Sequence, residues 1–149
     1  MIDIGSGNNY PANALSNFAP HQFIIDNVNC NSMEGFLQSL KFKDIEMQKN
    51  VCTLVGKAAK FKGKRKKWWI TQTLYWQGEE FKRNSQEYQE LLDKAYDCLF
   101  ENNSFRKALL STRGATLSHS IGKNKINETV LTEKEFIGQL KRLYNKENI

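Results

Sequence analysis

The sequence predicts a single, mainly helical α+β domain with a few short strands, and three observations indicate this class. Several segments repeat apolar residues with the spacing of an amphipathic helix, whereas the β-prone runs are short and bounded by turn residues. The chain has 149 residues, of which 40% are hydrophobic, so one compact domain can bury a sizeable core. No internal repeat or low-complexity linker interrupts it. We therefore expect one domain over residues 1–149.

The first expected elements are an N-terminal β-hairpin and the helix after it. Residues 21–30 contain a β-prone run, an Asp-Asn pair at 26–27 that suits a tight turn, and a returning VNC run. The twelve residues 31–42, NSMEGFLQSLKF, have helical spacing. Asn31 is expected to cap this helix, with Glu34 reaching back as in a capping box.

A second helix is expected to begin near Asp44 and to end before Gly63. Its exit is a basic segment, Lys60–Lys67, which leads directly into two tryptophans. The next run, ITQTLYWQGEEF at 70–81, alternates only in part and fits either a strand or an extended loop. The residues expected to face inward from the second helix are Met47, Val51, Leu54, Val55 and Ala58.

The C-terminal half is expected to contain three helices. Ser85 caps a strongly amphipathic one, and a shorter helix follows at about 104–111. The run ATLSHSIGK at 115–123 fits a brief strand or a loop, and Thr132 with Glu135 forms a capping box that opens the last helix. The expected buried residues of the first and last of these helices are Tyr88, Leu91, Leu92, Ala95, Tyr96, Leu99 and Phe100, then Phe136, Leu140 and Leu143.

Charge favours an anionic partner. The 22 Lys and Arg residues exceed the 16 Asp and Glu residues and give a formal charge of +6 at pH 7. Much of the excess lies in Lys60–Lys67, beside Trp68 and Trp69. One interpretation is a phosphate-attracting rim next to stacking aromatics, a combination that binds nucleic acids. The other is a solvated surface loop.

Several classes of protein are disfavoured. The three cysteines (Cys30, Cys52 and Cys98) are odd in number, widely spaced and without a CxxC pair, which argues against a disulfide framework and a zinc site. The two histidines are too few for a histidine-rich metal centre. No apolar run reaches 18 residues, and the N-terminus lacks the pattern of a signal peptide. We expect a cytoplasmic protein with no metal, no cofactor and no membrane partner, and its oligomeric state stays open.

The helix at 31–42 carries the clearest chemistry. Glu34, Gln38 and Lys41 stand at i, i+4 and i+7, so their side chains rise from almost one line beside an apolar sector. A carboxylate, an amide and an amine at the edge of a hydrophobic face can bind and polarise a substrate. A partly desolvated lysine loses its charge more readily, which makes Lys41 a candidate nucleophile. The alternative is a surface lysine paired with Glu34 or Gln38.

The order of many short motifs resembles one family. The motifs are LSNF at 15–18, the hairpin, SMEGFLQSLKF at 32–42, GKAA at 56–59, YWQG at 75–78, SQEYQELLDKAYDCLFEN at 85–102, FRKALL at 105–110, and SHSIGK at 118–123 followed by TVLTEKEF at 129–136. Together they resemble the NADAR family, named for its association with NAD and ADP-ribose, from about Leu15 to Tyr144. Many members have Glu-His where this chain has Glu34-Gly35, and a Trp-Gly element where it has residues 119–123.

The resemblance implies an α+β N-glycosidase that breaks the bond between C1′ of ribose and a nitrogen. Known activities in the family are cleavage of phosphoribosylated riboflavin-pathway intermediates and removal of ADP-ribose from guanine, including guanine in nucleic acid. The basic segment and the departures at Gly35 and 119–123 favour the second activity here. The expected partner is therefore ADP-ribosylated guanine, with a phosphoribosylated small molecule as the alternative. A module that only binds ADP-ribose, another nucleotide or nucleic acid is a third possibility, although Glu34 and Lys41 favour catalysis.

The resemblance also implies roles for individual residues. Glu34 is expected to stabilise the cationic transition state and manage the proton, while Lys41 attacks C1′ and gives an imine. In a competing arrangement Glu34 activates water and Lys41 only holds a phosphate. Gln38 is expected to orient its neighbours by hydrogen bonding.

Five further positions are candidate substrate contacts. Asn17 and Phe18 resemble the family's N-terminal site segment and are expected to hydrogen-bond and stack on the base. Trp69 and Trp76 are candidates for a second stacking surface, and His119 for a contact with the diphosphate or ribose. For Asn17, Phe18 and the two tryptophans the alternative is an ordinary core or turn position, and for His119 it is a satisfied polar residue beside a strand.

Overall fold

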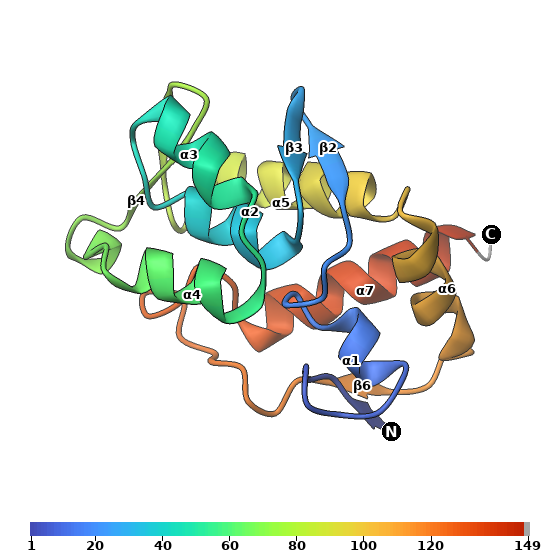
Figure 1. Cartoon of the computed structure of the whole chain (residues 1–149). Coiled ribbons are helices and arrows are strands. Elements are labelled where there is room, and N and C mark those ends of the chain that lie inside the picture. Colours follow the sequence, from blue (N-terminus) through green and yellow to red (C-terminus); the bar gives the residue numbers. More distant parts are fainter. Residues whose placement is uncertain (148–149) are drawn as a thin grey trace.

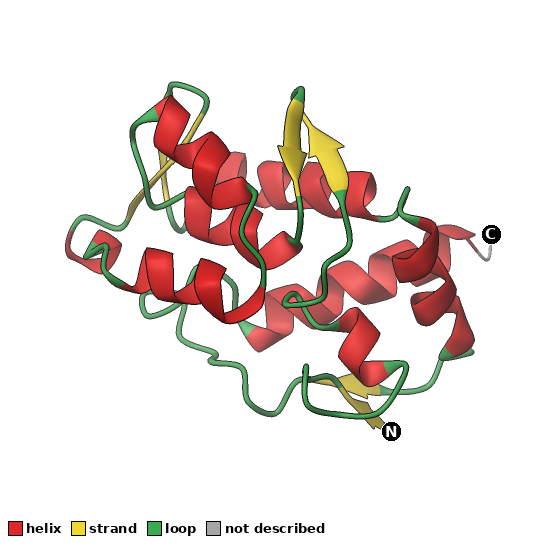
Figure 2. Cartoon of the chain, in the orientation of Figure 1, coloured by secondary structure: helices red, strands yellow, loops and turns green. Residues whose placement is uncertain are grey.

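The computed structural model describes residues 1–147, so the last two positions of the expected domain lie outside the described part. The α+β prediction is confirmed: helices dominate, and every sheet has two short strands (Figure 2). Among the described residues, no helix is long and apolar enough to cross a membrane. The elements, labelled in Figure 1 where there is room, are β1 (Ile2–Asp3), α1 (Ala12–Leu15), β2 (Phe23–Ile25), β3 (Val28–Cys30), α2 (Met33–Ser39), α3 (Ile45–Cys52), α4 (Gly56–Lys64), a 3-10 turn η1 (Trp68–Ile70), β4 (Thr73–Trp76), β5 (Glu79–Lys82), α5 (Gln86–Leu99), α6 (Asn103–Ser111), β6 (Leu117–Ser118) and α7 (Glu133–Glu147).

The N-terminal hairpin forms as predicted. Strands β2 and β3 pair antiparallel, with Ile25 opposite Val28. Asp26 and Asn27 both have positive φ, at 48° and 65°, which is the conformation that a two-residue hairpin turn of this hand requires. Side chains alternate between buried and exposed along both strands, so one face of the hairpin packs on the core.

Helix α2 begins and ends differently from the prediction. Ser32 caps it, because its Oγ accepts a hydrogen bond from the Gly35 backbone N at 3.0 Å. Asn31 instead donates through Nδ2 to the Thr53 carbonyl at 2.9 Å, so the predicted Asn31 cap and capping box are wrong. The helix ends at Ser39, and Lys41 lies in the turn that follows rather than on a third helical turn.

The predicted second helix is two helices. The chain turns after Cys52, where Thr53 closes α3, and it restarts at Gly56, which has a φ of +54° that favours glycine. This break changes which residues are buried: Val55 is exposed, and Ala59 packs inward in place of Ala58. The first half of the basic segment is also helical, since α4 continues to Lys64.

The segment 70–81, for which the sequence left a strand or an extended loop open, contains β4 and most of β5, which pair as a second hairpin. The residue after β5 is a buried arginine. Arg83 is 1% exposed and pairs with Glu135 of α7, with Nη2 2.6 Å from Oε1. Its Nε donates to the Thr129 carbonyl at 2.7 Å. A buried ion pair is tolerated only when its remaining polar atoms are bonded. Arg83 therefore fastens the second hairpin to the segment before α7.

The C-terminal elements agree with the prediction. Ser85 caps α5 by accepting from the Tyr88 backbone N, and Thr132 and Glu135 exchange the two hydrogen bonds of a capping box. The predicted stripe of α5 is buried apart from Leu91, which is half-buried. Strand β6 pairs in parallel with β1, so the N-terminal strand lies beside residues 117–118.

One apolar cluster joins these elements and positions the site. Helix α5 packs against α7 and β2, and α2 packs against α3 and α4. In Figure 1, α2, α3 and α4 lie together on one side of the molecule, and α1, α6 and the end of α7 lie on the other. The segment between β6 and α7 passes along the lower edge and faces α4.

Candidate active site

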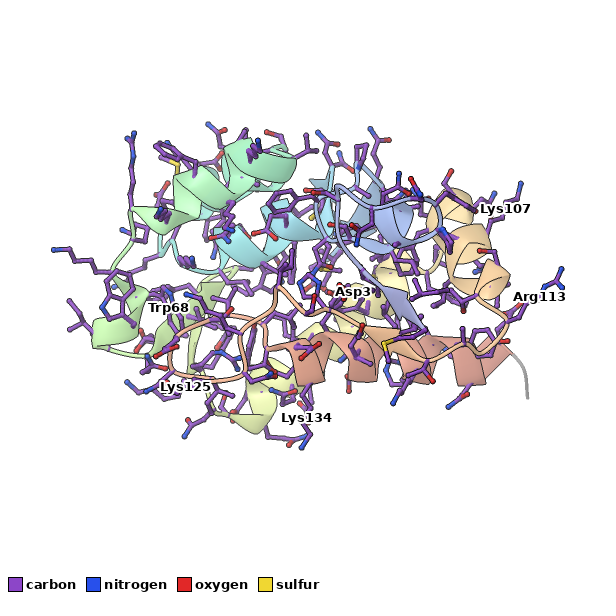
Figure 3. All side chains as sticks on the ribbon, turned by 90° about the horizontal axis from the view of Figure 1, so that it is seen from below. Asp3, Trp68, Lys107, Arg113, Lys125 and Lys134 are labelled. Atoms are coloured by element: carbon purple, nitrogen blue, oxygen red, sulfur yellow. The ribbon has the colours of Figure 1, made fainter. Side chains whose placement is uncertain are left out.

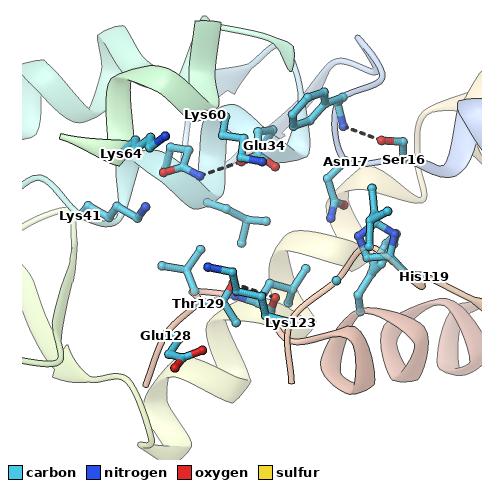
Figure 4. A pocket seen from close by; sticks show the side chains of 18 of the residues that line it. Ser16, Asn17, Glu34, Lys41, Lys60, Lys64, His119, Lys123, Glu128 and Thr129 are labelled. Carbon is cyan, nitrogen blue, oxygen red and sulfur yellow. Dashed lines mark hydrogen bonds between the residues drawn. The ribbon is translucent and has the colours of Figure 1, made fainter. Parts of the chain in front are cut away.

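A cavity of about 600 Å³ lies between α2 and α4 on one side and the segment from 119 to 131 on the other. Figure 4 shows this arrangement, with Glu34, Lys41, Lys60 and Lys64 along one wall and His119, Lys123, Glu128 and Thr129 along the opposite wall. The N-terminal segment closes one end through Asn17. The lining residues are Ser6, Ser16–Phe18, Glu34, Leu37, Gln38, Lys41, Lys60, Lys64, Trp68, Trp69, His119, Ile121–Lys123, Glu128–Leu131 and Phe136.

Glu34 is held at the inner wall by two contacts. Its backbone N donates to the Asn17 carbonyl at 3.0 Å, and its Oε2 accepts from Gln38 Nε2 at 2.7 Å. Burial raises the pKa of this carboxyl above its usual range, although the Gln38 hydrogen bond and the positive charge of Lys41 oppose the rise. A carboxyl with a raised pKa keeps its proton nearer to neutral pH and is suited to donate it.

Lys41 lines the same cavity. Burial lowers the pKa of its amine to about 8, which the Glu34 charge opposes and the nearby Lys123 and Lys60 charges reinforce. At pH 7, about one Lys41 in ten is therefore neutral. Its Nζ lies 3.5 Å from the Gly63 carbonyl, and among the described residues it has no carboxylate within ion-pair distance. The structure therefore does not contain the alternative arrangement, in which Lys41 is a surface lysine paired with Glu34 or Gln38.

Gln38 connects Glu34 to α4. It is 6% exposed, and its Oε1 is the one buried side-chain polar atom without a hydrogen-bond partner in the described chain. The amide packs directly on Gly63, where an added Cβ would lie 1.8 Å from Oε1. Gly63 therefore leaves the space that lets the Gln38 amide reach Glu34.

Replacing Gly63 with alanine is expected to lower the glycosidase activity that the resemblance implies, without unfolding the protein. The new methyl group must displace the end of a flexible side chain, which breaks the bond from Gln38 to Glu34, whereas alanine favours the helix by about 1 kcal/mol. Catalysis by a displaced group falls steeply, so we expect a loss of roughly 10- to 100-fold in kcat. Thermal unfolding and turnover of the purified variant check this; Ala58→Gly, on the exposed face of α4, is the control for helix propensity. Full activity in Gly63→Ala would show that the amide contact is dispensable.

Asn17 and Phe18 lie at the cavity, as the resemblance implied. The Tyr96 hydroxyl donates to Asn17 Oδ1 at 2.7 Å, which leaves the amide NH2 group of Asn17 to meet a ligand. The Phe18 ring is half-buried, with Lys60 Nζ 6.0 Å from its centroid.

His119 stands on the opposite wall. Its Nδ1 lies 2.8 Å from the Ile4 carbonyl, and because a carbonyl only accepts, Nδ1 carries the proton of this bond. The ring also packs edge-on against Phe136, with centroids 5.2 Å apart. In the neutral ring, Nε2 is then an acceptor.

The two predicted tryptophans have different positions. Trp69 is 48% exposed at the edge of the cavity and can stack on a ligand. Trp76 is a core residue: it is 6% exposed, its Nε1 donates to Asp26 Oδ2 at 2.7 Å, and its ring packs on Phe36. The prediction that Trp76 contacts substrate is wrong, because its strand directs it into the core. Trp68, which the sequence offered only as an aromatic beside the basic segment, lines the cavity.

Three cavity lysines were not identified individually from the sequence. Lys60 and Lys64 lie one helical turn apart on α4, and Lys123 faces them from the other wall (Figure 4). With Lys41 they outnumber the carboxylates that line the cavity, Glu34 and Glu128. The excess of positive charge suits an anionic ligand such as a diphosphate. The described residues contain no group of three or more side chains able to hold a metal ion.

By fold, the chain is a NADAR-like protein. Its structure is similar to the NMR structure of E. coli YbiA, a NADAR family protein, with a TM-score of 0.64, 17% sequence identity, and coverage of 99% of this chain and 87% of that chain. Within this fold, the chain belongs to the bacteriophage protein GP30.3 family, which matches residues 9–145. A 17.1 kDa protein from the Gp30-rIII intergenic region of Enterobacteria phage T4 is 38% identical over 145 residues, which cover 95% of each chain.

Proposed function

We propose that this protein is an N-glycosidase that hydrolyses the bond between C1′ of ribose and a nitrogen, and that its substrate is ADP-ribosylated guanine. The observation that carries the proposal is the presence of Glu34 and Lys41 in one cavity, with the pKa of the acid raised and the pKa of the amine lowered to about 8. Opposite shifts of this kind prepare a proton donor and a neutral nucleophile at similar pH.

In the proposed reaction, the neutral amine of Lys41 attacks C1′ and the C1′–N bond breaks. The bonding electrons leave with the base nitrogen, which takes a proton from the Glu34 carboxyl. As the sugar ring opens, its oxygen takes a proton from the lysine nitrogen, and the lysine adduct becomes a protonated imine. Water then adds to C1′ and gives one proton to the Glu34 carboxylate. Its second proton passes to the lysine nitrogen as the bond between C1′ and lysine breaks, which releases free ADP-ribose and the neutral lysine. The net reaction is hydrolysis and needs no further reactant.

The rest of the cavity supports this assignment of substrate. Lys60, Lys64 and Lys123 supply positive charge for the diphosphate. Trp69 and Phe18 offer ring faces to guanine or adenine, and the Asn17 amide offers a donor. A diphosphate makes better use of three lysines on two walls than a single phosphate does, which favours ADP-ribose over a phosphoribosylated riboflavin-pathway intermediate.

The imine predicts a covalent product that borohydride traps. Reduction during turnover is expected to add the sugar mass to Lys41. The yield is expected to fall toward acid pH, because Lys41 attacks only when neutral, and to fall again toward alkaline pH, because Glu34 then no longer carries the proton that it donates. Mass spectrometry of the reduced protein checks both. Lys41→Arg, which keeps the charge but forms no imine, is expected to abolish trapping and turnover, whereas Lys60→Arg is the matched control that keeps both.

The competing arrangement gives Lys41 a different role. If Lys41 only holds a phosphate, it acts as an ammonium, so substrate binding weakens as the pH rises through about 8 and Lys41→Arg stays active. Incubation in chelator with ADP-ribosylated guanosine and, separately, with a phosphoribosylated aminopyrimidine tests the substrate. Release of neither free base nor free ADP-ribose after long incubation would leave a binding module in place of an enzyme.

A further inference from the structure

The surplus positive charge of the protein lies in one segment of the chain. Residues 57–67 contain seven of the 22 basic residues and none of the 16 acidic ones, so the other 15 basic side chains do not exceed the acids. No acidic residue occurs between Glu46 and Glu79. All seven cations are exposed, and none forms an ion pair with another described residue. Interaction with the helix dipole stabilises at most two of the seven cations, the lysines in the last turn of α4, and does not explain the others.

Helix α4 divides these charges between two faces. Lys60 and Lys64 line the cavity, whereas Lys57, Lys62 and Arg65 surround a shallow depression on the outer face. Figure 3, which views the molecule from below, shows this helix along the upper edge at the left, above Trp68, with no other helix or strand outside it. The proposed reaction uses the cavity face, and nothing in it uses the outer one.

Exposed aromatic rings accompany the outer charges. Phe61 is 60% exposed in the middle of the depression, and the Arg65 guanidinium lies 5.0 Å from its ring centroid. Trp69 is 48% exposed where this basic stretch reaches the edge of the cavity. Proteins bind single strands of nucleic acid with cations that lie along the sugar-phosphate backbone and with aromatic rings on which the bases stack.

We propose that the outer face of α4, made of Lys57, Phe61, Lys62 and Arg65, binds a single nucleic-acid strand and leads it past Trp69 to the cavity. The proposal rests on the proposed function in that the strand carries the modified guanine. A base inside a duplex cannot reach a pocket without leaving its stack, so an unpaired strand is the form that fits. A membrane surface fits less well, because the apolar side of α4 is already buried against α2 and a membrane-binding helix needs a broad free one.

Fluorescence anisotropy with an unmodified, labelled single strand of about 12 nucleotides tests this surface. Lys57→Gln/Lys62→Gln/Arg65→Gln is expected to weaken binding at least tenfold at low salt and to reduce the slope of log affinity against log salt by about 2. Phe61→Ala is expected to weaken binding about fivefold or more with the slope unchanged, because stacking is not ionic. The matched control is Lys107→Gln/Lys134→Gln/Lys141→Gln, which removes three exposed charges elsewhere and is expected to bind as the wild type does.

Two results would overturn the proposal: equal losses in the two triple variants, or binding of the duplex or of anionic phosphatidylserine vesicles as tight as that of the single strand. The outcome is separable from that of the proposed function. The Lys57→Gln/Lys62→Gln/Arg65→Gln variant is expected to release ADP-ribose from modified guanosine at the wild-type rate. Its rate is expected to fall only when the substrate is a modified single strand. A protein that binds strands but cleaves no substrate would refute the glycosidase alone.

Discussion

Replacing Glu34 with glutamine is expected to lower the single-turnover rate of base release by about 100- to 10,000-fold, the usual contribution of a general acid. Glutamine keeps the size of the side chain, and its carbonyl oxygen still accepts the hydrogen bond from Gln38. It cannot give a proton to the departing nitrogen. Rapid-quench measurement at saturating substrate isolates this step from binding.

The other cavity carboxylate supplies the control. Glu128 is exposed on the opposite wall, and Glu128→Gln is expected to keep the single-turnover rate while binding the diphosphate somewhat more tightly, because a negative charge is lost. Thermal unfolding of both variants should match that of the wild type, since Glu34→Gln removes a charge whose burial is unfavourable. A Glu34→Gln enzyme within tenfold of wild-type activity would assign the proton to another group.

Replacing Gly35 with alanine is expected to destabilise the protein by about 2–3 kcal/mol and to lower the melting temperature by roughly 5–10 °C. An added Cβ would lie 2.6 Å from the Leu54 carbonyl oxygen and 3.0 Å from that of Val51. Both atoms belong to the backbone at the turn from α3 to α4, so the helices must separate to admit a methyl group. Differential scanning calorimetry gives the loss directly.

Gly138→Ala is the matched control for this substitution. Gly138 is also inside a helix, α7, but it is exposed and an added Cβ would meet nothing within 4 Å. Helix propensity then predicts stabilisation by about 1 kcal/mol. If Gly35→Ala and Gly138→Ala both stabilise the protein, the close approach of α2 to the turn between α3 and α4 does not exclude a side chain at residue 35.

The same contact gives a physical reason for one departure from the NADAR pattern. Many members have histidine after the glutamate, whereas this chain has Gly35. With three backbone carbonyls within 3.1 Å of the Cβ position, a histidine has no room while the turn stays where it is. In this chain, the backbone after α3 occupies the space of that side chain.

Sequence rules succeeded where the determining interactions are local. A positive-φ Asp-Asn turn, a Ser85 cap and a Thr132–Glu135 capping box each depend on a few neighbouring residues, and all three form. Helical spacing also led to Glu34, Gln38 and Lys41, which share the cavity even though α2 ends at Ser39. The turn after α2 keeps Lys41 on the same side.

The errors arose where distant segments decide the outcome. The break between α3 and α4 accompanies the packing of Gly35 from another helix, and the helical position of Lys60 and Lys64 follows from that break. The sequence could not show that Trp76 lies in the core and Trp69 at the cavity. The position of Trp76 depends on its hydrogen bond to Asp26, 50 residues away. Lys123 has no local signal at all and reaches the cavity only through the path of the segment before α7.

The parallel pairing of β1 with β6 makes the cavity dependent on the order of synthesis. Ile2 pairs with Leu117, and the His119 ring bonds to the Ile4 carbonyl, 115 residues earlier in the chain. Because the opposite wall belongs to residues 119–131, a nascent chain on the ribosome cannot enclose the cavity until that segment has been synthesised. The enclosed cavity therefore forms only after the segment that follows α6 has emerged and packed against the first strand.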